Sequence, residues 1–316
     1  LGETNGGVVV TDLSKLEQPE YKTSFRPLFK TISNTEKMTI TKLSDINLTI
    51  KEDINLQTVT FDGDNNRTMT TANQVFVENG LAYVADAYGL IIYDVENNVS
   101  LGSLEAYDYN YGESNATYDQ YYNSDPVSIQ VISDLNVSDT VYSKVAVMAN
   151  HYGSVALFDV TDSSNPSYIT GDILSEVYGA DGYYTTNAIV KDGKLYISNY
   201  QTATDKANGW SNEILIIELS TLTLLEQIET VENINSIVFD SGYAYISAGY
   251  DGLIITPDTN LSNTLATYNT PDFAWYTNIK ENIVYIADSY TGIVMLDITD
   301  KSNPIYLDTL KVSGDT

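Results

Sequence analysis

Residues 85–95 read ADAYGLIIYDV, and variants of this stretch return three times along the chain. They are ANHYGSVALFDV at residues 149–160, SAGYDGLII at residues 247–255 and ADSYTGIVMLDI at residues 287–298. Each copy has a short apolar run, a turn with Tyr and Gly, and a second apolar run. A unit this small cannot bury its own apolar face, so it must stack against further copies of itself. The repeat therefore predicts the fold.

The stretch lies inside a longer unit that predicts four strands joined by tight turns. Residues 74–107 contain the runs QVFVENG, LAYVADAYG, LIIYDV and LGSLEAY, which have the alternation and turn residues of strands. Four further copies follow, and the turn glycines Gly252 and Gly292 lie 40 residues apart. Four strands in about 40 to 45 residues is the spacing of a propeller blade. We expect an all-β fold, a β-propeller of four-stranded antiparallel blades, with six blades and with five or seven as alternatives.

The repeats divide the chain into three parts that we expect to form one propeller body. Residues 1–23 contain GGVVVTDLSKLEQPEY, which matches only the second half of the unit. Residues 24–72 are rich in predicted strands such as KMTITKL but do not keep the register of the repeat, and residues 73–316 hold the five blades. We expect the N-terminal half-blade to help close the ring. The alternative is that it pairs with another subunit, because an unpaired strand edge is a template for association.

Three turns after the third strand of the unit share a motif. They read DVTDSSNP at residues 159–166, DITDKSNP at residues 297–304 and, more weakly, DLSKLEQP at residues 12–19. With the preceding YVAD and YIAD strands, these segments resemble the LVIVD repeat of bacterial and archaeal surface proteins. The resemblance implies a β-propeller and a surface location, while the molecular function of that family is poorly defined. The chain departs from the pattern at the insert QTATDKANGWSN and at Pro257, where the Asp-Val pair is lost.

The motif also has a direct physical interpretation. Asp and Ser side chains bond nearby backbone N–H groups in tight turns, and Pro fixes φ. We therefore expect these residues to separate strands three and four of a blade.

The composition excludes several functions. Fifteen Lys and Arg stand against 43 Asp and Glu, a net charge of −28, which repels nucleic acid and anionic lipid surfaces. No cysteine is present, so disulfides and thiolate chemistry are excluded, and no apolar run is long enough for membrane insertion. We expect the charge to serve solubility or, alternatively, cation binding or life in salty surroundings. The 26 tyrosines and few arginines are typical of microbial surface proteins, so we expect an extracellular or cell-surface location.

The hairpins between the second and third strands carry the first candidate ligand-binding residues. In a propeller these hairpins emerge on one face, so phenols would stand beside carboxylates and amides. Such a rim suits a glycan, because aromatic rings stack on sugar C–H patches while acids and amides accept hydroxyls. The alternative is that each Tyr packs on the next blade and each Asp or Asn holds its own turn. The candidates are Asp86, Tyr88, Asn150, Tyr152, Tyr250, Asp288 and Tyr290.

Other aromatic residues lie in predicted loops. Residues 107–125 form the most biased segment, rich in Tyr, Asp and Asn, and are either a solvated insertion or a recognition loop. A second insertion carries Trp210, and the last blade opens with Phe273, Trp275 and Tyr276. We expect aromatic loops from several blades to converge.

No cofactor is predicted, with calcium as an alternative at one segment. Asp62, Asp64 and Asn66 resemble the opening of a calcium loop, whose cation takes oxygen ligands at alternate positions. The twelfth position is Asn73 and Arg67 replaces the usual glycine, so an EF-hand is not expected. A polar turn is the default interpretation.

Catalytic signatures are missing from the sequence. His151 is the single histidine, and neither a G-x-S-x-G elbow nor a phosphate loop is present. The predicted inner strands offer few acids, which leaves Asp125, Asp181 and Asp272 as the only reasonable glycosidase candidates. We therefore predict a non-enzymatic surface module that recognises a glycan, a matrix or a protein. The alternatives are a subunit of a surface layer or filament that self-assembles through the half-blade and, third, a glycan-active enzyme.

Overall fold

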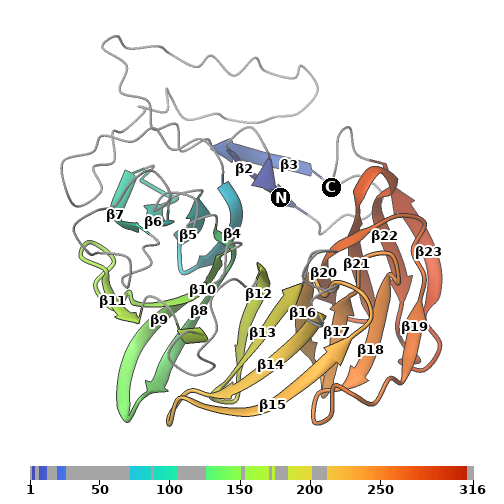
Figure 1. The fold of residues 1–316 in the computed structure, drawn as a ribbon. Helices are drawn as coiled ribbons and strands as arrows, with labels where there is room; N and C mark the ends of the chain where they lie inside the picture. Colours follow the sequence, from blue (N-terminus) through green and yellow to red (C-terminus); the bar gives the residue numbers. More distant parts are fainter. Residues whose placement is uncertain are drawn as a thin grey trace, which may run out of the picture. The chain divides into compact units, whose positions relative to one another are not determined.

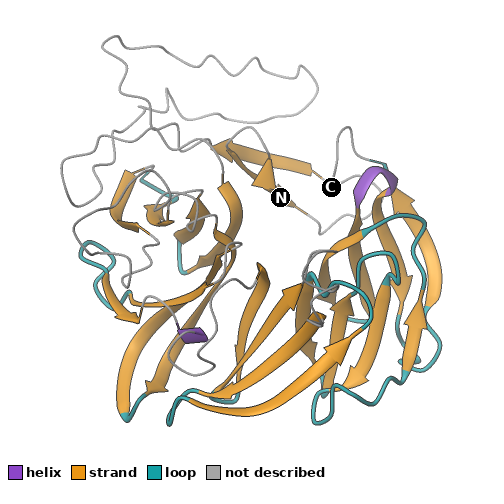
Figure 2. Cartoon of the chain, in the orientation of Figure 1, coloured by secondary structure: helices purple, strands orange, loops and turns teal. Residues whose placement is uncertain are grey.

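Strands make up most of the described residues (Figure 2). The fold is a β-propeller of four-stranded antiparallel blades, as the repeat predicts. The computed structural model describes strand backbone in residues 2–3, 7–12 and 20–25, and describes residues 72–86, 89–97, 99–105, 126–150, 154–170, 173–174, 184–200 and 212–311.

Five four-stranded blades follow one another along the described chain (Figure 1). In each blade the strands pair in sequence order, so every blade is a simple meander. The first blade contains β4 (Ala72–Glu78), β5 (Leu81–Asp86), β6 (Gly89–Asp94) and β7 (Val99–Glu105). The second contains β8 (Pro126–Val137), β9 (Thr140–Asn150), β10 (Ser154–Asp159) and β11 (Ser167–Thr170). The third contains β12 (Tyr184–Lys191), β13 (Lys194–Tyr200), β14 (Asn212–Glu218) and β15 (Thr223–Thr230).

The last two blades have the same order. The fourth contains β16 (Ser236–Asp240), β17 (Tyr243–Ser247), β18 (Leu253–Pro257) and β19 (Ala266–Tyr268). The fifth contains β20 (Ala274–Lys280), β21 (Ile283–Asp288), β22 (Gly292–Asp297) and β23 (Ile305–Leu310), with the 3-10 turn η3 (Ser289–Thr291) between β21 and β22.

The N-terminal strands form a smaller sheet. β1 (Gly2–Glu3), β2 (Gly7–Asp12) and β3 (Glu20–Phe25) pair as a three-stranded antiparallel sheet. The β2–β3 pairing shifts register between Val10 and Thr11, as the β22–β23 pairing does between Met295 and Leu296. This sheet repeats the outer part of a blade but has no fourth strand among the described residues, so the structure has five four-stranded blades instead of the expected six. The half-blade's role in ring closure stays a prediction.

The chain divides into two compact units, and the first holds the N-terminal strands, the first blade and most of the second blade. This unit comprises Leu1–Asp134, Tyr142–Asn150 and Ala156–Asp172. Its core forms where apolar side chains of the two blades meet, because alternate residues of each strand point to the same sheet face. The buried residues are Tyr83, Ala85, Leu90, Ile92, Ile129, Val131, Ala146, Met148, Ala156, Phe158 and Val160.

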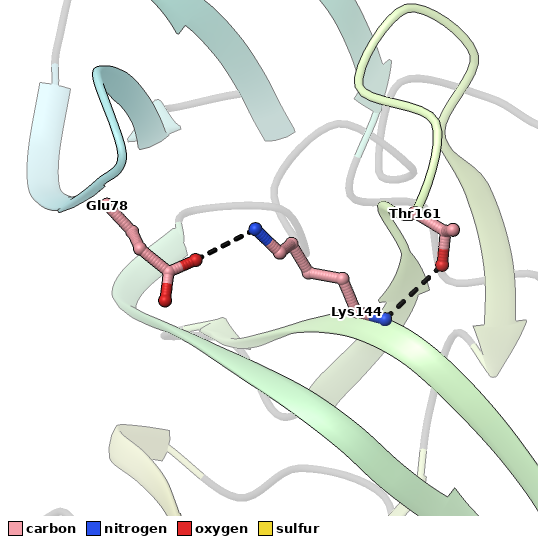
Figure 3. Close-up of polar contacts among 3 residues, drawn as sticks. All are labelled: Glu78, Lys144 and Thr161. Atoms are coloured by element: carbon pink, nitrogen blue, oxygen red, sulfur yellow. Dashed lines mark hydrogen bonds and ion pairs between the residues drawn. The ribbon is translucent and has the colours of Figure 1, made fainter.

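Polar contacts also join the first and second blades. Gln74 Oε1 accepts the Ile129 N–H at 2.6 Å. Lys144 Nζ lies 2.8 Å from Glu78 Oε2, while the Lys144 backbone N–H donates to Thr161 Oγ1 at 3.2 Å (Figure 3). The hydrogen bond to Glu78 raises the pKa of the Lys144 amine. These contacts add polar links to the apolar core between the two blades.

The second unit holds the third, fourth and fifth blades, and comprises Leu135–Val141, His151–Val155 and Ile173–Thr316. Its apolar cores lie between the third and fourth blades, around Tyr196, Ile216 and Ile246, and between the fourth and fifth, around Tyr245, Val284 and Leu296.

Buried hydroxyls join the inner strands of the fourth and fifth blades. Ser236 Oγ donates to Ser247 Oγ at 3.0 Å and accepts the Thr277 N–H at 3.1 Å, and Ser247 Oγ lies 2.6 Å from Thr277 Oγ1. Because all three residues are buried, these bonds satisfy groups that would otherwise be costly to bury.

The expected turns between strands three and four are confirmed. Asp159 Oδ1 accepts the Thr161 N–H at 2.9 Å, and Asp162 Oδ1 accepts the Ser164 N–H at 2.9 Å. The other Ser-Asn-Pro turn repeats the pattern, since Asp300 Oδ1 accepts the Ser302 N–H at 3.0 Å. Hydrogen bonds from Ser302 lower the pKa of the Asp300 carboxyl. The motif thus acts as a turn, as its residues imply.

Candidate functional site

Three aromatic side chains meet at one end of the fourth and fifth blades. We call Tyr250, Phe273 and Trp275 the aromatic patch. The ring centroids of Tyr250 and Phe273 are 4.9 Å apart at an interplanar angle of 84°, and those of Phe273 and Trp275 are 4.6 Å apart at 54°. Tyr250 is 66% exposed and Trp275 49%, with Phe273 half-buried between them. Large aromatic residues exposed together are typical of recognition surfaces.

The patch is assembled across a blade boundary. Tyr250 comes from the turn between β17 and β18, whereas Phe273 and Trp275 flank the first residue of β20. Gly249 makes this approach feasible, since its φ is +52° and a Cβ there would lie 2.9 Å from Phe273 Cε2. A side chain at residue 249 would displace the central ring.

Backbone hydrogen bonds hold the patch in place. The Ala274 N–H donates to the Gly249 carbonyl at 2.9 Å. The Ala274 carbonyl accepts Asn235 Nδ2 at 2.8 Å, and Asn235 is itself buried. Ala274 is therefore fixed on both of its backbone polar groups, and its neighbours Phe273 and Trp275 are fixed with it. Preorganisation of this kind lowers the entropic cost of binding.

Acidic residues accompany the patch. Asp251 follows Tyr250 and is exposed, and Asp272 precedes Phe273 and is half-buried. The Asp272 N–H donates to Asp288 Oδ2 at 3.0 Å. No Lys or Arg occurs in the sequence between Lys206 and Lys280, so the fourth blade has no cationic side chain.

Two further predicted residues lie near this end of the fifth blade. Tyr276, near the start of β20, is 40% exposed, and Tyr290, in the turn η3 between β21 and β22, is 77% exposed. The structure shows no ring contact that joins either residue to the aromatic patch among the described aromatic pairs.

The predicted rim of acids and amides is buried. Asp86, Asn150 and Asp288 end the second strands of their blades, and each has at most 1% of its surface exposed. Asp288 fixes the chain that leads into its own blade by accepting the Asp272 N–H. This arrangement corresponds to the alternative in which such residues hold turns, because buried carboxylates and amides do not face a ligand in solution.

The remaining predicted residues lie outside the described part of the chain. They are Tyr88, Tyr152, Trp210, the calcium candidates Asp62, Asp64 and Asn66, and the carboxylates Asp125 and Asp181. In the part that is described, no group of three or more His, Cys, Asp or Glu is placed to hold a metal ion.

Sequence reasoning missed a buried carboxylate in the third blade. Glu213 is 2% exposed, and in the register of β13 and β14 it lies opposite Asn199. At the equivalent place in the first and fifth blades, a glycine lies opposite the acid: Gly89 opposite Asp86 and Gly292 opposite Asp288. An acid at a position that is glycine in other copies was the signal that could have identified it.

The surroundings of Glu213 are polar but incompletely bonded. Gln227 Nε2 donates to Glu213 Oε2 at 2.5 Å, and Thr185 Oγ1 donates to Asn199 Oδ1 at 3.1 Å. Glu213 Oε1 is buried and has no hydrogen-bond partner among the described residues. Burial raises the pKa of the Glu213 carboxyl, and the hydrogen bond from Gln227 opposes that rise.

We expect Glu213→Gln to reduce the loss of stability as pH rises. A raised folded-state pKa means that the contribution of Glu213 is complete below the ordinary value of 4.5 and is lost as pH rises through the folded value. As pH rises through this range, the free energy of unfolding should therefore fall less in the variant than in the parent. Urea unfolding from about pH 4 to about pH 8 measures the difference. Glu226→Gln, on an exposed residue of β15, is the control; parallel curves for Glu213→Gln and the parent would contradict the expectation.

None of the helices in the described residues has the length and apolarity needed to cross a bilayer. No curated protein matches the chain. A crystal structure of the computationally designed Ika8 protein is similar in fold, with a TM-score of 0.51, 10% identity, and 83% of this chain and 67% of that chain covered. A crystal structure of the computationally designed Ika4 protein is a weaker likeness, with a TM-score of 0.38, 11% identity, and 64% of this chain and 97% of that chain covered.

The family model for the LVIVD repeat matches residues 70–108 and 274–314. These ranges hold the first and fifth blades, which carry the YVAD and YIAD strands. The chain thus carries LVIVD repeats in two places and is a β-propeller, in agreement with an LVIVD-repeat propeller family.

Proposed function

We propose that this protein is a non-enzymatic binding and structural module that works outside the cell or at the cell surface. It recognises a glycan, a matrix or another protein through the loop face that carries the aromatic patch. The observation that carries the proposal is the contact of Tyr250, Phe273 and Trp275, which exposes aromatic surface on a backbone fixed by hydrogen bonds.

The choice of a glycan over a nucleic acid or a lipid surface is supported by charge. A net charge of −28 repels phosphate-rich partners. Aromatic rings, in contrast, stack on the apolar C–H faces of sugars whatever the charge of the protein.

We expect Tyr250→Ala and Trp275→Ala each to weaken binding of an immobilised glycan or matrix ligand by about tenfold or more, because exposed aromatic anchors carry most of the free energy at such surfaces. A glycan array followed by titration of the best ligand measures the effect. Tyr306→Ala is the matched control, since Tyr306 is 49% exposed and lies on β23. Unchanged affinity in both patch variants would refute the assignment of the patch as the binding surface.

The second candidate function is assembly into a surface layer or filament. It is favoured by the N-terminal sheet, which has three strands where each blade has four. A strand from another subunit would complete such a sheet by edge pairing. Sizing of the full chain across a range of concentrations, against a chain without Leu1–Phe25, tests this function. Assembly that persists without those residues would exclude the half-blade as its cause.

Hydrolysis of a glycan is the third candidate. Asp272 is the one predicted carboxylate of this kind in the described residues, and its backbone supports Asp288 and the patch. Polysaccharide turnover that disappears in Asp272→Asn would replace the binding proposal with an enzymatic one.

A further inference from the structure

We propose that the aromatic patch selects glycans with free, protonated amino groups, such as glucosamine oligomers, over acetylated or acidic glycans. This inference rests on the proposed function and names the ligand class of the same site. It depends on the angles between the rings and on the charges around them.

The rings do not form one flat platform. Tyr250 stands nearly perpendicular to Phe273, and Trp275 is inclined to Phe273 by 54°. One flat sugar chain therefore cannot stack on all three rings together. Instead, the exposed residues Tyr250 and Trp275 each contact the half-buried Phe273, and their rings are inclined to it at different angles. An aromatic face attracts either a sugar C–H patch or a cation.

Charge decides between neutral and cationic ligands. Asp251 and Asp272 each adjoin a ring of the patch in sequence, and the buried Asp288 lies behind Asp272. The first cationic residue after the patch is Lys280, at the far end of β20. Lys311 follows β23 and lies beside Gly292, since a Cβ on Gly292 would be 3.3 Å from the Lys311 Cα. Neither lysine belongs to the two segments that build the patch. The two segments that build the patch thus contain acids and no base.

Aromatic faces and carboxylates act in the same direction on an ammonium group. The ring quadrupole attracts the cation, and the neighbouring carboxylates add Coulomb attraction that salt screens. An acetylated amine keeps the C–H face but loses the charge, and a uronic acid is repelled. We expect a free amine to bind on the order of tenfold more tightly than its acetylated counterpart at low salt.

The experiment uses the full chain and three hexasaccharides. The first contains only glucosamine, the second only N-acetylglucosamine and the third only galacturonic acid. Calorimetric titration at about pH 5.5 keeps the sugar amines protonated. We expect the glucosamine oligomer to bind most tightly, the N-acetylglucosamine oligomer to bind more weakly and the galacturonate oligomer not to bind. Raising salt from about 50 to about 500 mM should weaken only the glucosamine oligomer appreciably.

Variants separate the site from the bulk charge of the protein. Tyr250→Ala and Trp275→Ala should weaken both glucosamine and N-acetylglucosamine oligomers about tenfold or more. Asp251→Asn and Asp272→Asn should lower the ratio of the affinity for the glucosamine oligomer to the affinity for the N-acetylglucosamine oligomer. Tyr306→Ala should change the affinity for neither oligomer.

Each contrary result has a distinct meaning. Equal affinity for the free and acetylated oligomers overturns the selectivity and leaves glycan binding at the patch intact. Glucosamine binding that survives both aromatic substitutions overturns the inference, because bulk charge then accounts for it. If no hexasaccharide binds, the inference fails, and the proposed function survives only where a protein or matrix ligand loses affinity in the same aromatic variants.

Discussion

Gly252→Ala should destabilise the protein by roughly 3 to 5 kcal/mol, because the added methyl group has no space and the backbone conformation opposes it. Gly252 has a φ of +74°, and a Cβ there would lie 2.3 Å from the Tyr268 carbonyl oxygen and 2.5 Å from the Thr270 backbone nitrogen. Both obstacles belong to the backbone, so no side-chain rotation relieves them. Thermal and urea unfolding of the purified variant measure the loss.

Gly242→Ala is the matched control for this experiment. Gly242 has a φ of +84°, but no atom lies within 4 Å of the position of its Cβ. It should therefore show only the backbone cost of a left-handed alanine, about 1 to 2 kcal/mol. Similar losses for the two variants would show that strand β19 moves aside to admit a side chain, and would contradict the tight approach of β19 to the β17–β18 turn.

Tyr245→Ala should lower the free energy of unfolding by about 3 to 5 kcal/mol, since it removes a large ring from between two blades. Tyr245 is fully buried and packs with Val284 and Leu296 of the fifth blade. Its loss leaves a cavity that the two sheets cannot close without losing their inter-blade hydrogen bonds. Denaturant unfolding, with the slope compared between variants, measures the effect.

Tyr245→Phe distinguishes the ring from the hydroxyl. The Tyr245 hydroxyl is buried without a hydrogen-bond partner among the described residues, and burial raises its pKa to about 12. Removing it should increase the free energy of unfolding by about 1 kcal/mol, because an unsatisfied polar group leaves the core. A large loss in Tyr245→Phe would mean that the hydroxyl makes a bond essential to the blade.

The strand content and the blade unit could be predicted because their signals are local. Alternation of apolar residues identifies each strand, and Ser-Asn-Pro with its aspartates identifies a turn whose hydrogen bonds close within a few residues. The number of blades was harder to predict, since a segment such as residues 6–21 has the pattern of a blade without all of its strands. The alternation of residues shows that a segment forms a strand. The number of strands in its sheet depends on which other strands lie beside it in the fold.

The site was predicted in part for the same reason. Tyr250, Phe273 and Trp275 stood out as aromatic residues in or beside turns, yet nothing local shows that Tyr250 of the fourth blade contacts Phe273 at the start of the fifth. Asp86 and Asp288 were candidates as exposed acceptors, but the structure buries both. Turn residues look alike in sequence whether they face solvent or hold the chain, so burial could not be inferred from residue type.

The sequence by itself determined the repeated four-stranded unit, the turns that divide it and the net charge of −28, since each follows from spacing or composition. Only the tertiary structure decided that Tyr250 meets Phe273, that the rim acids are inside and that Glu213 is buried in the third blade. Those outcomes depend on how neighbouring blades stack, and stacking places residues from different copies within a few ångströms of one another. The periodicity within one copy therefore cannot predict which residues of neighbouring blades come into contact.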